Sequence, residues 1–316
     1  MRRPGAAALV LGAVVAAGAA GSAALAGPSD PTLAVRDAQG RLDVWWRAAA
    51  APAHWAAADA RLAAMVAWKP AADGVEWAEL PIAGGGEARA IRLILVRIDP
   101  ALAPLAVVWG VDAASGRPAW TIDRAPPGAA VAVNAGMFVG SVPWGWLVLD
   151  GREVLPPGTG PLSSALVIRR DGRVAWVDGD DLAAWRGRPD VAFAFQSYPS
   201  LLVGDGDVPA PLRTGAVINR RHRDARLTLG LDAAGRLLVV LTRLDVAVPG
   251  ADRLPFGLTV PEMAAVMGGL GARRAMLLDG GISAQLLVRD AANETRRWPG
   301  LRPVPLALLA GPGGAR

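Results

Sequence analysis

The sequence contains no cysteine, and this absence excludes disulfide bonds, cysteine-ligated zinc sites, iron–sulfur clusters and thiol nucleophiles. Histidine is also scarce. The only two histidines, His54 and His222, lie too far apart in the chain to support a metal site built from several histidines. Lysine occurs once, at Lys69, so the basic residues are almost entirely arginines.

Several familiar catalytic motifs are missing as well. The sequence has no P-loop, no H-E-x-x-H and no convincing G-x-G-x-x-G, and residues 281–285 supply only half of a G-x-S-x-G elbow. The acidic clusters at 178–181 and 205–207 lack the EF-hand pattern, so a structural calcium ion stays an open option. The sequence thus predicts no required cofactor and no catalytic metal.

Charge is low and evenly spread. Charged residues make up 19% of the chain and hydrophobic residues 53%, which argues against disorder and allows a sizeable core. The net charge is +5, but the arginines are scattered, with short clusters at 220–223 and 296–297. A nucleic-acid-binding protein concentrates its basic residues in a longer stripe, so we expect no nucleic-acid partner. Anionic groups such as phosphate remain plausible partners.

The first 26 residues have the pattern of a signal peptide. Arg2 and Arg3 precede an apolar run at 6–20, and Ala24-Leu25-Ala26 offers small residues to a signal peptidase. Cleavage after Ala26 would leave a periplasmic or secreted protein without a membrane span, because no later stretch is long and apolar enough. The alternative is an uncleaved anchor.

The remaining chain divides into two predicted parts. Residues 27–74 are rich in alanine and tryptophan, and alanine, leucine and methionine around 53–68 favour an accessory helical segment. Residues 75–310 form the main domain.

Most of the main domain reads as strands joined by turns. Asp150-Gly151 and Asp171-Gly172 are strong hairpin signals. Strands are predicted at 90–98, 105–109, 131–133, 147–149, 165–168, 174–177, 226–231, 237–242 and 274–278. One clear helix begins at Thr259, which forms a capping box with Glu262, and ends before Gly271. These elements predict an α+β fold with a mixed, mostly antiparallel sheet core and a few packed helices.

The strongest chemical signal is Asp279-Gly280-Gly281, followed by Ser283. An apolar strand that ends in a carboxylate places this charge at the edge of the core, and two glycines let a ligand approach the backbone closely. The alternative is an ordinary turn in which Asp279 caps the loop.

Two further segments end a strand in a polar side chain. Asn134 and Gly136 follow the run 131–133, and Gln196 and Ser197 follow the apolar residues 193–195. Each pair is a candidate binding edge. The alternatives are an Asn-Gly type turn for the first pair and a plain strand end for the second.

The basic run at 220–226 is the last candidate. Arginine side chains suit phosphate or carboxylate recognition, which makes Arg221, Arg223 and Arg226 candidates, with His222 between them. A charge run is usually a solvated loop, but Arg226 opens an apolar strand and is expected to point inward.

In this order the segments resemble the phosphodiester glycosidase (NAGPA-type) domain family. The resemblance covers roughly residues 75–309. It rests on N-A-G-M-F at 134–138, Q-S-x-P-x-L at 196–201, the arginine-led strand 226–230, L-T-x-P-E-M-A at 258–264 and L-D-G-G-x-S at 278–283. Two departures occur: Tyr198 stands where many relatives have glycine, and Leu227-Thr228 replaces a pair that is often polar and small.

The resemblance implies a single catalytic domain that hydrolyses a sugar-1-phosphodiester, with a glycan or sugar-phosphate substrate. It implies a site lined by Asn134, Gln196, Arg226, Asp279, Gly280, Gly281 and Ser283. On that basis Asp279 stabilises an oxocarbenium-like sugar or activates water, and Arg226 (or Arg221 or Arg223) binds phosphate. Asn134 and Gln196 hold sugar hydroxyls, and His222 shuttles a proton.

Two other functions fit the same residues. The chain could be a non-catalytic exported module that binds cell-envelope or exopolysaccharide glycans, or a hydrolase of phosphodiesters that contain no sugar. Turnover separates the first from an enzyme, and a comparison of nucleoside, lipid and sugar diesters separates the second. The sequence predicts neither the sugar nor the oligomeric state.

Overall fold

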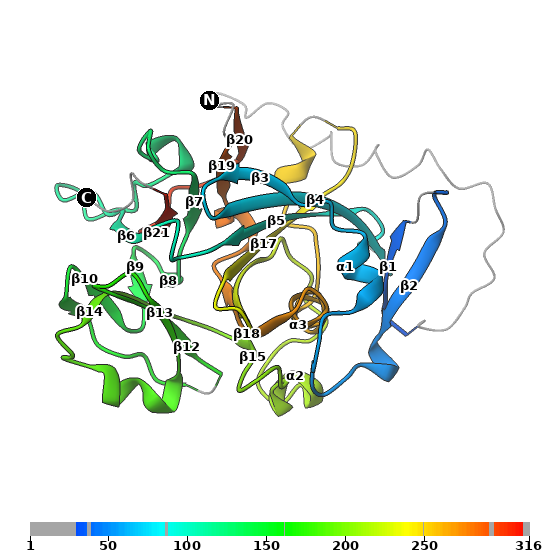
Figure 1. Cartoon of the computed structure of the whole chain (residues 1–316), viewed down its shortest axis with the longest axis horizontal. Helices are drawn as coiled ribbons and strands as arrows, with labels where there is room; N and C mark the ends of the chain where they lie inside the picture. Colours follow the sequence, from blue (N-terminus) through cyan, green and yellow to red (C-terminus); the bar gives the residue numbers. More distant parts are fainter. Residues whose placement is uncertain are drawn as a thin grey trace, which may run out of the picture. The chain divides into compact units, whose positions relative to one another are not determined.

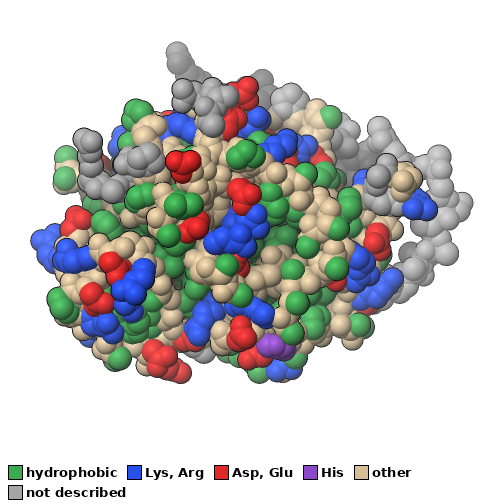
Figure 2. Space-filling view, in the orientation of Figure 1, with side chains coloured by type: hydrophobic (Ala, Val, Ile, Leu, Met, Phe, Trp, Pro, Cys, Tyr) green, Lys and Arg blue, Asp and Glu red, His purple; other side chains and the backbone are tan. Residues whose placement is uncertain are grey.

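The computed structural model describes residues 30–36, 39–85, 88–160, 162–248, 250–290 and 294–311. The predicted signal peptide at 1–26 lies outside these ranges. No helix within them is long and apolar enough to cross a membrane. Basic and acidic side chains are interspersed on the face shown in Figure 2, and no single stripe of one sign crosses it.

A nine-stranded sheet forms the centre of the fold (Figure 1). Its strand order is β15-β18-β16-β17-β5-β4-β1-β2, with β3 paired to β4, and every pair is antiparallel. The strands are β1 (Thr32–Arg36), β2 (Leu42–Arg47), β3 (Lys69–Ala72), β4 (Val75–Gly84), β5 (Ile91–Ile98), β15 (Ser200–Leu202), β16 (Leu227–Asp232), β17 (Leu237–Leu244) and β18 (Ala272–Leu278).

The remaining strands form two five-stranded antiparallel sheets and one hairpin. The first sheet has the order β11-β10-β14-β12-β13 and the second the order β20-β19-β7-β21-β6. Their strands are β6 (Leu105–Trp109), β7 (Val131–Asn134), β10 (Leu147–Leu149), β11 (Arg152–Leu155), β12 (Ser164–Arg169), β13 (Val174–Asp178), β14 (Val191–Ser197), β19 (Leu286–Arg289), β20 (Thr295–Trp298) and β21 (Leu306–Ala310). The hairpin pairs β8 (Met137–Val139) with β9 (Val142–Trp144).

Three α-helices lie in the described ranges: α1 (Ala60–Ala64), α2 (Ala210–Thr214) and α3 (Val260–Gly269). Helix α3 packs against β15 and β18 (Figure 1). The predicted capping box is confirmed, because the Thr259 side chain accepts from the Glu262 N–H and the Glu262 carboxylate accepts from the Thr259 N–H at 2.8 Å.

The central sheet is buried on both faces, which explains its continuous apolar strands. In β17, Leu237, Val239 and Leu241 face the core shared with the two five-stranded sheets, whereas Leu238 and Val240 face the core that includes α3. Alternate residues of β17 are therefore buried in different cores. A strand that is buried on both faces in this way requires an unbroken run of hydrophobic residues.

The predicted α+β class with mostly antiparallel sheets is confirmed. The predicted helical segment at 27–74 is wrong for its described part. The helical elements there are the short α1, capped by the Asp59 side chain, and one 3-10 turn at Ala48–Ala50, while β1, β2 and β3 belong to the central sheet. Buried Trp45 and Trp46 show the reason: pairing and packing in the sheet outweigh the weak helix preference of nearby alanines.

Candidate functional site

The ends of β7 and β18 lie side by side and are tied together by two hydrogen bonds, and a third joins Asn134 to the residue before β19. The Asn134 side-chain amide donates to the Asp279 carbonyl at 2.8 Å, and its oxygen accepts from the Gln285 N–H at 2.9 Å. The Asp279 N–H donates to the Gly136 carbonyl at 2.8 Å. Two strand ends that are 145 residues apart in sequence therefore meet at one place.

The glycines after Asp279 allow a third segment to join them. The Gly281 N–H donates to the Ala225 carbonyl at 2.7 Å, and a Cβ on Gly280 would lie 2.5 Å from that same oxygen. Gly281 has φ +55°, and a Cβ there would lie 3.1 Å from a carboxylate oxygen of Asp224. Glycine at both positions is thus what lets the Asp279 loop pack directly against Asp224 and Ala225.

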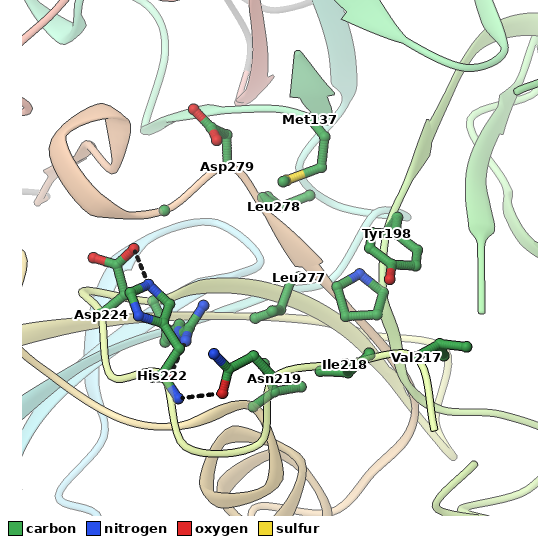
Figure 3. Close-up of a pocket in the computed structure, with 14 residues that line it drawn as sticks. Met137, Tyr198, Val217, Ile218, Asn219, His222, Asp224, Leu277, Leu278 and Asp279 are labelled. Atoms are coloured by element: carbon green, nitrogen blue, oxygen red, sulfur yellow. Dashed lines mark hydrogen bonds and ion pairs between the residues drawn. The ribbon is translucent and has the colours of Figure 1, made fainter. Parts of the chain in front are cut away.

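A cavity of about 310 Å³ opens where these segments meet (Figure 3). Its volume lies at the small end of the range for ligand pockets. Apolar side chains form much of the wall, with Asp224, His222 and Asn219 together on one side and Asp279 at the end of β18 (Figure 3). The lining residues are Met137, Tyr198, Pro199, Val217, Ile218, Asn219, His222, Asp224, Arg226, Val260, Leu277, Leu278, Asp279 and Gly280.

Two carboxylates of this cavity are poorly solvated. Burial raises the pKa of both Asp224 and Asp279, and the charge of Asp224 raises the pKa of Asp279 further. Asp224 Oδ1 and Asp279 Oδ2 are buried without a hydrogen-bond partner in the described part of the chain. Unsatisfied buried carboxylate oxygens are costly and mark a candidate functional site.

Arg302 and Ser283 moderate the charge of Asp279 from behind the cavity. Arg302 Nη2 lies 3.6 Å from Asp279 Oδ2, an ion-pair distance that is too long for a hydrogen bond. Arg302 Nε donates to Ser283 Oγ at 2.8 Å. Both side chains lower the pKa of Asp279, so they oppose the effect of its burial.

The cationic side of the cavity is built around Arg226. Its Nε donates to the Leu258 carbonyl at 2.8 Å and its Nη2 to the His222 carbonyl at 2.7 Å. Burial lowers the pKa of Arg226, while the charge of Asp224 raises it. The exposed His222 ring places Nε2 3.7 Å from Asp224 Oδ2. A histidine, a carboxylate and a guanidinium therefore share one edge of the cavity.

The raised pKa of Asp224 predicts a gain in stability when its charge is removed. The folded state holds the proton more tightly than the unfolded state, so ionisation destabilises the fold as pH rises above the unfolded value near 3.8. Asp224→Asn is expected to raise Tm at pH 7, and the gain should vanish below pH 3.8, where the wild type is also uncharged. Thermal unfolding across this range measures it.

The matched control for this variant is Asp171→Asn. An ion pair with Arg173 lowers the pKa of Asp171, so loss of that charge should not stabilise the protein. An equal rise in Tm for both variants, or no rise for Asp224→Asn, would contradict the assigned burial of a charged Asp224.

Four of the predicted site residues line the cavity, namely His222, Arg226, Asp279 and Gly280. Gly136, Gly281 and Ser283 lie directly behind it, in backbone or side-chain contact with the Asp279 loop. Arg221 is an exposed loop residue that does not line it.

Neither Asn134 nor Gln196, the predicted sugar contacts, lines the cavity. Both side chains are buried, and Gln196 is saturated, since it accepts from the Trp146 and Gly158 N–H groups and donates to the Gly158 carbonyl and Ser163 Oγ. No donor or acceptor remains on that amide for a substrate. These amides hold the strand ends in place instead.

Ser197 and Arg223 are also structural rather than substrate contacts. Ser197 Oγ is buried and donates to the Leu277 carbonyl at 2.6 Å. Arg223 binds both oxygens of buried Glu262, at 2.7 and 2.8 Å. Each side chain already has its partner inside the protein.

The residue that sequence reasoning missed is Asp224. It was hidden in a charge run that resembles a solvated loop, and its one distinguishing sign was its position immediately before an apolar strand. Asn219 and Arg302 were missed too, and no sequence signal marks them. Within the described ranges, no three acidic or histidine side chains come close enough to hold a metal ion.

Comparisons with known proteins agree on the family and the fold. The phosphodiester glycosidase family (NAGPA) matches residues 127–310, more than half of the chain. A search of curated proteins found no match.

Among solved structures, the fold is similar to the catalytic domain of zebrafish N-acetylglucosamine-1-phosphodiester alpha-N-acetylglucosaminidase, auto-inhibited by its pro-peptide. The TM-score is 0.58 at 15% identity, covering 83% of this chain and 96% of that one. A hypothetical protein from Synechocystis (15% identity, 75% and 62% coverage) and a putative exported protein from Burkholderia pseudomallei (17%, 71% and 75%) are more distant, each with a TM-score of 0.43. Because the family model matches more than half of its length, this chain belongs to the phosphodiester glycosidase family.

Proposed function

We propose that the chain is an exported hydrolase that cleaves the sugar–oxygen bond of a sugar-1-phosphodiester, releasing the sugar and a phosphate monoester. The observation that carries this proposal is the pair of desolvated carboxylates, Asp224 and Asp279, that face one cavity together with Arg226. Paired carboxylates are the usual machinery of glycoside hydrolysis, and an arginine suits a phosphate group.

The leaving group defines the role of the cationic edge. When the bond between the sugar C1 and the phosphate oxygen breaks, its electron pair leaves with the phosphate. Arg226 stabilises the charge that develops there. A phosphate monoester is a better leaving group than an alcohol, so its departure needs little help from a strong general acid. The two backbone carbonyls that hold the Arg226 guanidinium keep it oriented before substrate arrives.

The two carboxylates divide the remaining work. Asp279 stabilises the oxocarbenium-like sugar, and Asp224 accepts the proton of the water molecule that attacks C1. The raised pKa of Asp224 makes it a better base than an exposed aspartate. His222, exposed beside Asp224, passes that proton to solvent.

The apolar wall argues for a substrate with a bulky group next to the sugar phosphate. Tyr198 and Trp144 pack with ring centroids 6.1 Å apart, and Met137 and Val217 line the same cavity. Tyr198 thus fills space that a glycine at this position would leave open. The proposed export rests on the signal-peptide pattern at 1–26, and cell-envelope or exopolysaccharide glycans are the matching substrate class.

Arg226→Ala tests the assigned phosphate contact. We expect kcat for hydrolysis of a glycosyl-1-phosphodiester to fall by about 10²–10³-fold, because the variant loses the donor group aimed at the developing charge. Release of reducing sugar measures the rate. The matched control is Arg173→Ala, an exposed arginine in the turn between β12 and β13, which should keep the wild-type rate. A wild-type rate for Arg226→Ala would remove Arg226 from the mechanism, and retention of the diester without turnover by the wild type would make the chain a binder.

A further inference from the structure

A second cavity lies away from the carboxylate pocket, where β17 ends beside the start of β5. Its volume is about 330 Å³, which is within the range of small-molecule sites. It is lined by Arg92, Arg243, Leu244, Asp245, Val246, Ala247, Val248, Gly250, Asp252 and Trp298, none of which lines the first cavity.

Two arginines face each other in this second cavity. Arg243 of β17 pairs directly with Arg92 of β5, so their side chains leave the sheet on the same face. Like charges at directly opposed positions are unfavourable unless they are neutralised. Arg92 is neutralised, since it binds Glu79 at 3.1 Å and also forms an ion pair with Asp245.

Arg243 has no such partner. Its side chain is 2% exposed, and no carboxylate of the described chain lies within ion-pair distance of it. Its Nη2 donates to the carbonyls of Ala284, Trp298 and Pro299, but Nε is buried without a partner and Nη1 donates to no described residue. Burial lowers the pKa of Arg243 to about 10, so it stays charged at neutral pH at a cost in desolvation.

A buried charge that lines a cavity and has donors to spare is the structural complement of an anion. Three carbonyls hold one nitrogen of the guanidinium in place, which leaves the planar fork oriented and in need of an oxygen ligand. Binding an oxyanion would supply the missing counter-charge in a site of low solvation, where charge-assisted hydrogen bonds are strong.

We propose that this cavity is a second, separate binding site for a small oxyanion, a phosphate or carboxylate group, with Arg243 as its charged contact. Asp252 also lines the cavity, and its charge partly offsets the desolvation of Arg243 although it lies beyond ion-pair distance. The exposed side chains of Val246 and Val248 lie on the loop over the cavity, where a ligand enters.

The test is calorimetric titration of inorganic phosphate at pH 7 into three variants of the whole chain. Arg226→Ala removes the anion contact of the carboxylate pocket and should still bind one phosphate per chain. Val246→Asp adds a negative charge to the second cavity at an exposed position, and should weaken that binding about tenfold or more when combined with Arg226→Ala. The control combines Arg226→Ala with Leu42→Asp, which adds the same charge at a similarly exposed residue of β2. Phosphate binding by this control should be unchanged.

Two results would overturn the proposal: no phosphate bound by Arg226→Ala, or equal affinities when Val246→Asp and Leu42→Asp are compared in that background. A competition arm with acetate then distinguishes the ligands. Displacement of phosphate by acetate supports a general oxyanion site, and no displacement supports a phosphate site.

Discussion

Replacing Asp279 by asparagine is expected to lower kcat for sugar-1-phosphodiester hydrolysis by about 10²–10⁴-fold, the range typical of a lost catalytic carboxylate. The substitution keeps the shape of the side chain and removes only its charge. That charge is what stabilises the cationic sugar as the C1–oxygen bond breaks. Release of reducing sugar at saturating substrate measures the effect.

The fold should survive this change, which makes the result interpretable. Burial raises the pKa of Asp279, so the ionised side chain is a cost to the folded state and asparagine relieves it. The Asp279 backbone contacts with Asn134 and Gly136 do not depend on its side chain. An Asp279→Asn protein of unchanged or higher Tm with at least one-third of the wild-type rate would exclude Asp279 from the chemistry.

Glu262→Ala is expected to be the most destabilising single change outside the hydrophobic core, at about 3–5 kcal/mol of unfolding free energy. Glu262 is fully buried and accepts from Nη1 and Nη2 of Arg223 while it also caps the amino end of α3. Its loss leaves a partly buried guanidinium without its counter-charge and an unpaired Thr259 N–H. Chemical denaturation with urea measures the difference.

Glu294→Ala is the matched control for Glu262→Ala, because the Glu294 side chain is 67% exposed and pairs with Arg296 on the surface. Exposed pairs contribute about 0–1 kcal/mol. If Glu262→Ala lowered the free energy of unfolding by no more than Glu294→Ala, the loop 217–226 would not depend on the Arg223–Glu262 pair for its position.

The convergence of the site was predictable from the sequence because each segment carried its own signal. An apolar strand that ends in Asp279, and another that ends in Asn134, must deliver their polar residues to sheet ends. Gly280 and Gly281 were predicted to let a ligand approach the backbone, but in the structure the backbone of Ala225 is what approaches them. The capping box at Thr259 and Glu262 likewise fixed the start of α3 from local chemistry alone.

Which polar side chains are free to bind a substrate, and which are bound to other parts of the protein, could not be predicted in this way. A buried amide such as Gln196 can bind a substrate hydroxyl or a backbone group equally well, and only the positions of Trp146, Gly158 and Ser163 decide between them. For the same reason Asp224 looked like part of a solvated run. Its burial arises from the glycine loop that packs on it, which lies far along the chain.

The segment before β4 was misread for a different reason. Helix propensity differs by only about 0.7 kcal/mol between ordinary residues, so an alanine-rich stretch is a weak argument for helix. At the edge of the central sheet, β1 and β2 find hydrogen-bond partners. Trp45 and Trp46 pack into the hydrophobic core that includes α3. Neither of these is visible in the local sequence.

The most direct test of the account is hydrolysis of a glycosyl-1-phosphodiester in water enriched in ¹⁸O, with mass analysis of both products. If Asp224 and Asp279 act on the sugar carbon while Arg226 holds the departing phosphate, the label must enter the hydroxyl at C1 and the phosphate monoester must stay unlabelled. Label in the phosphate would mean that water attacks phosphorus, and it would contradict the assignment of this cavity to glycosidic bond cleavage.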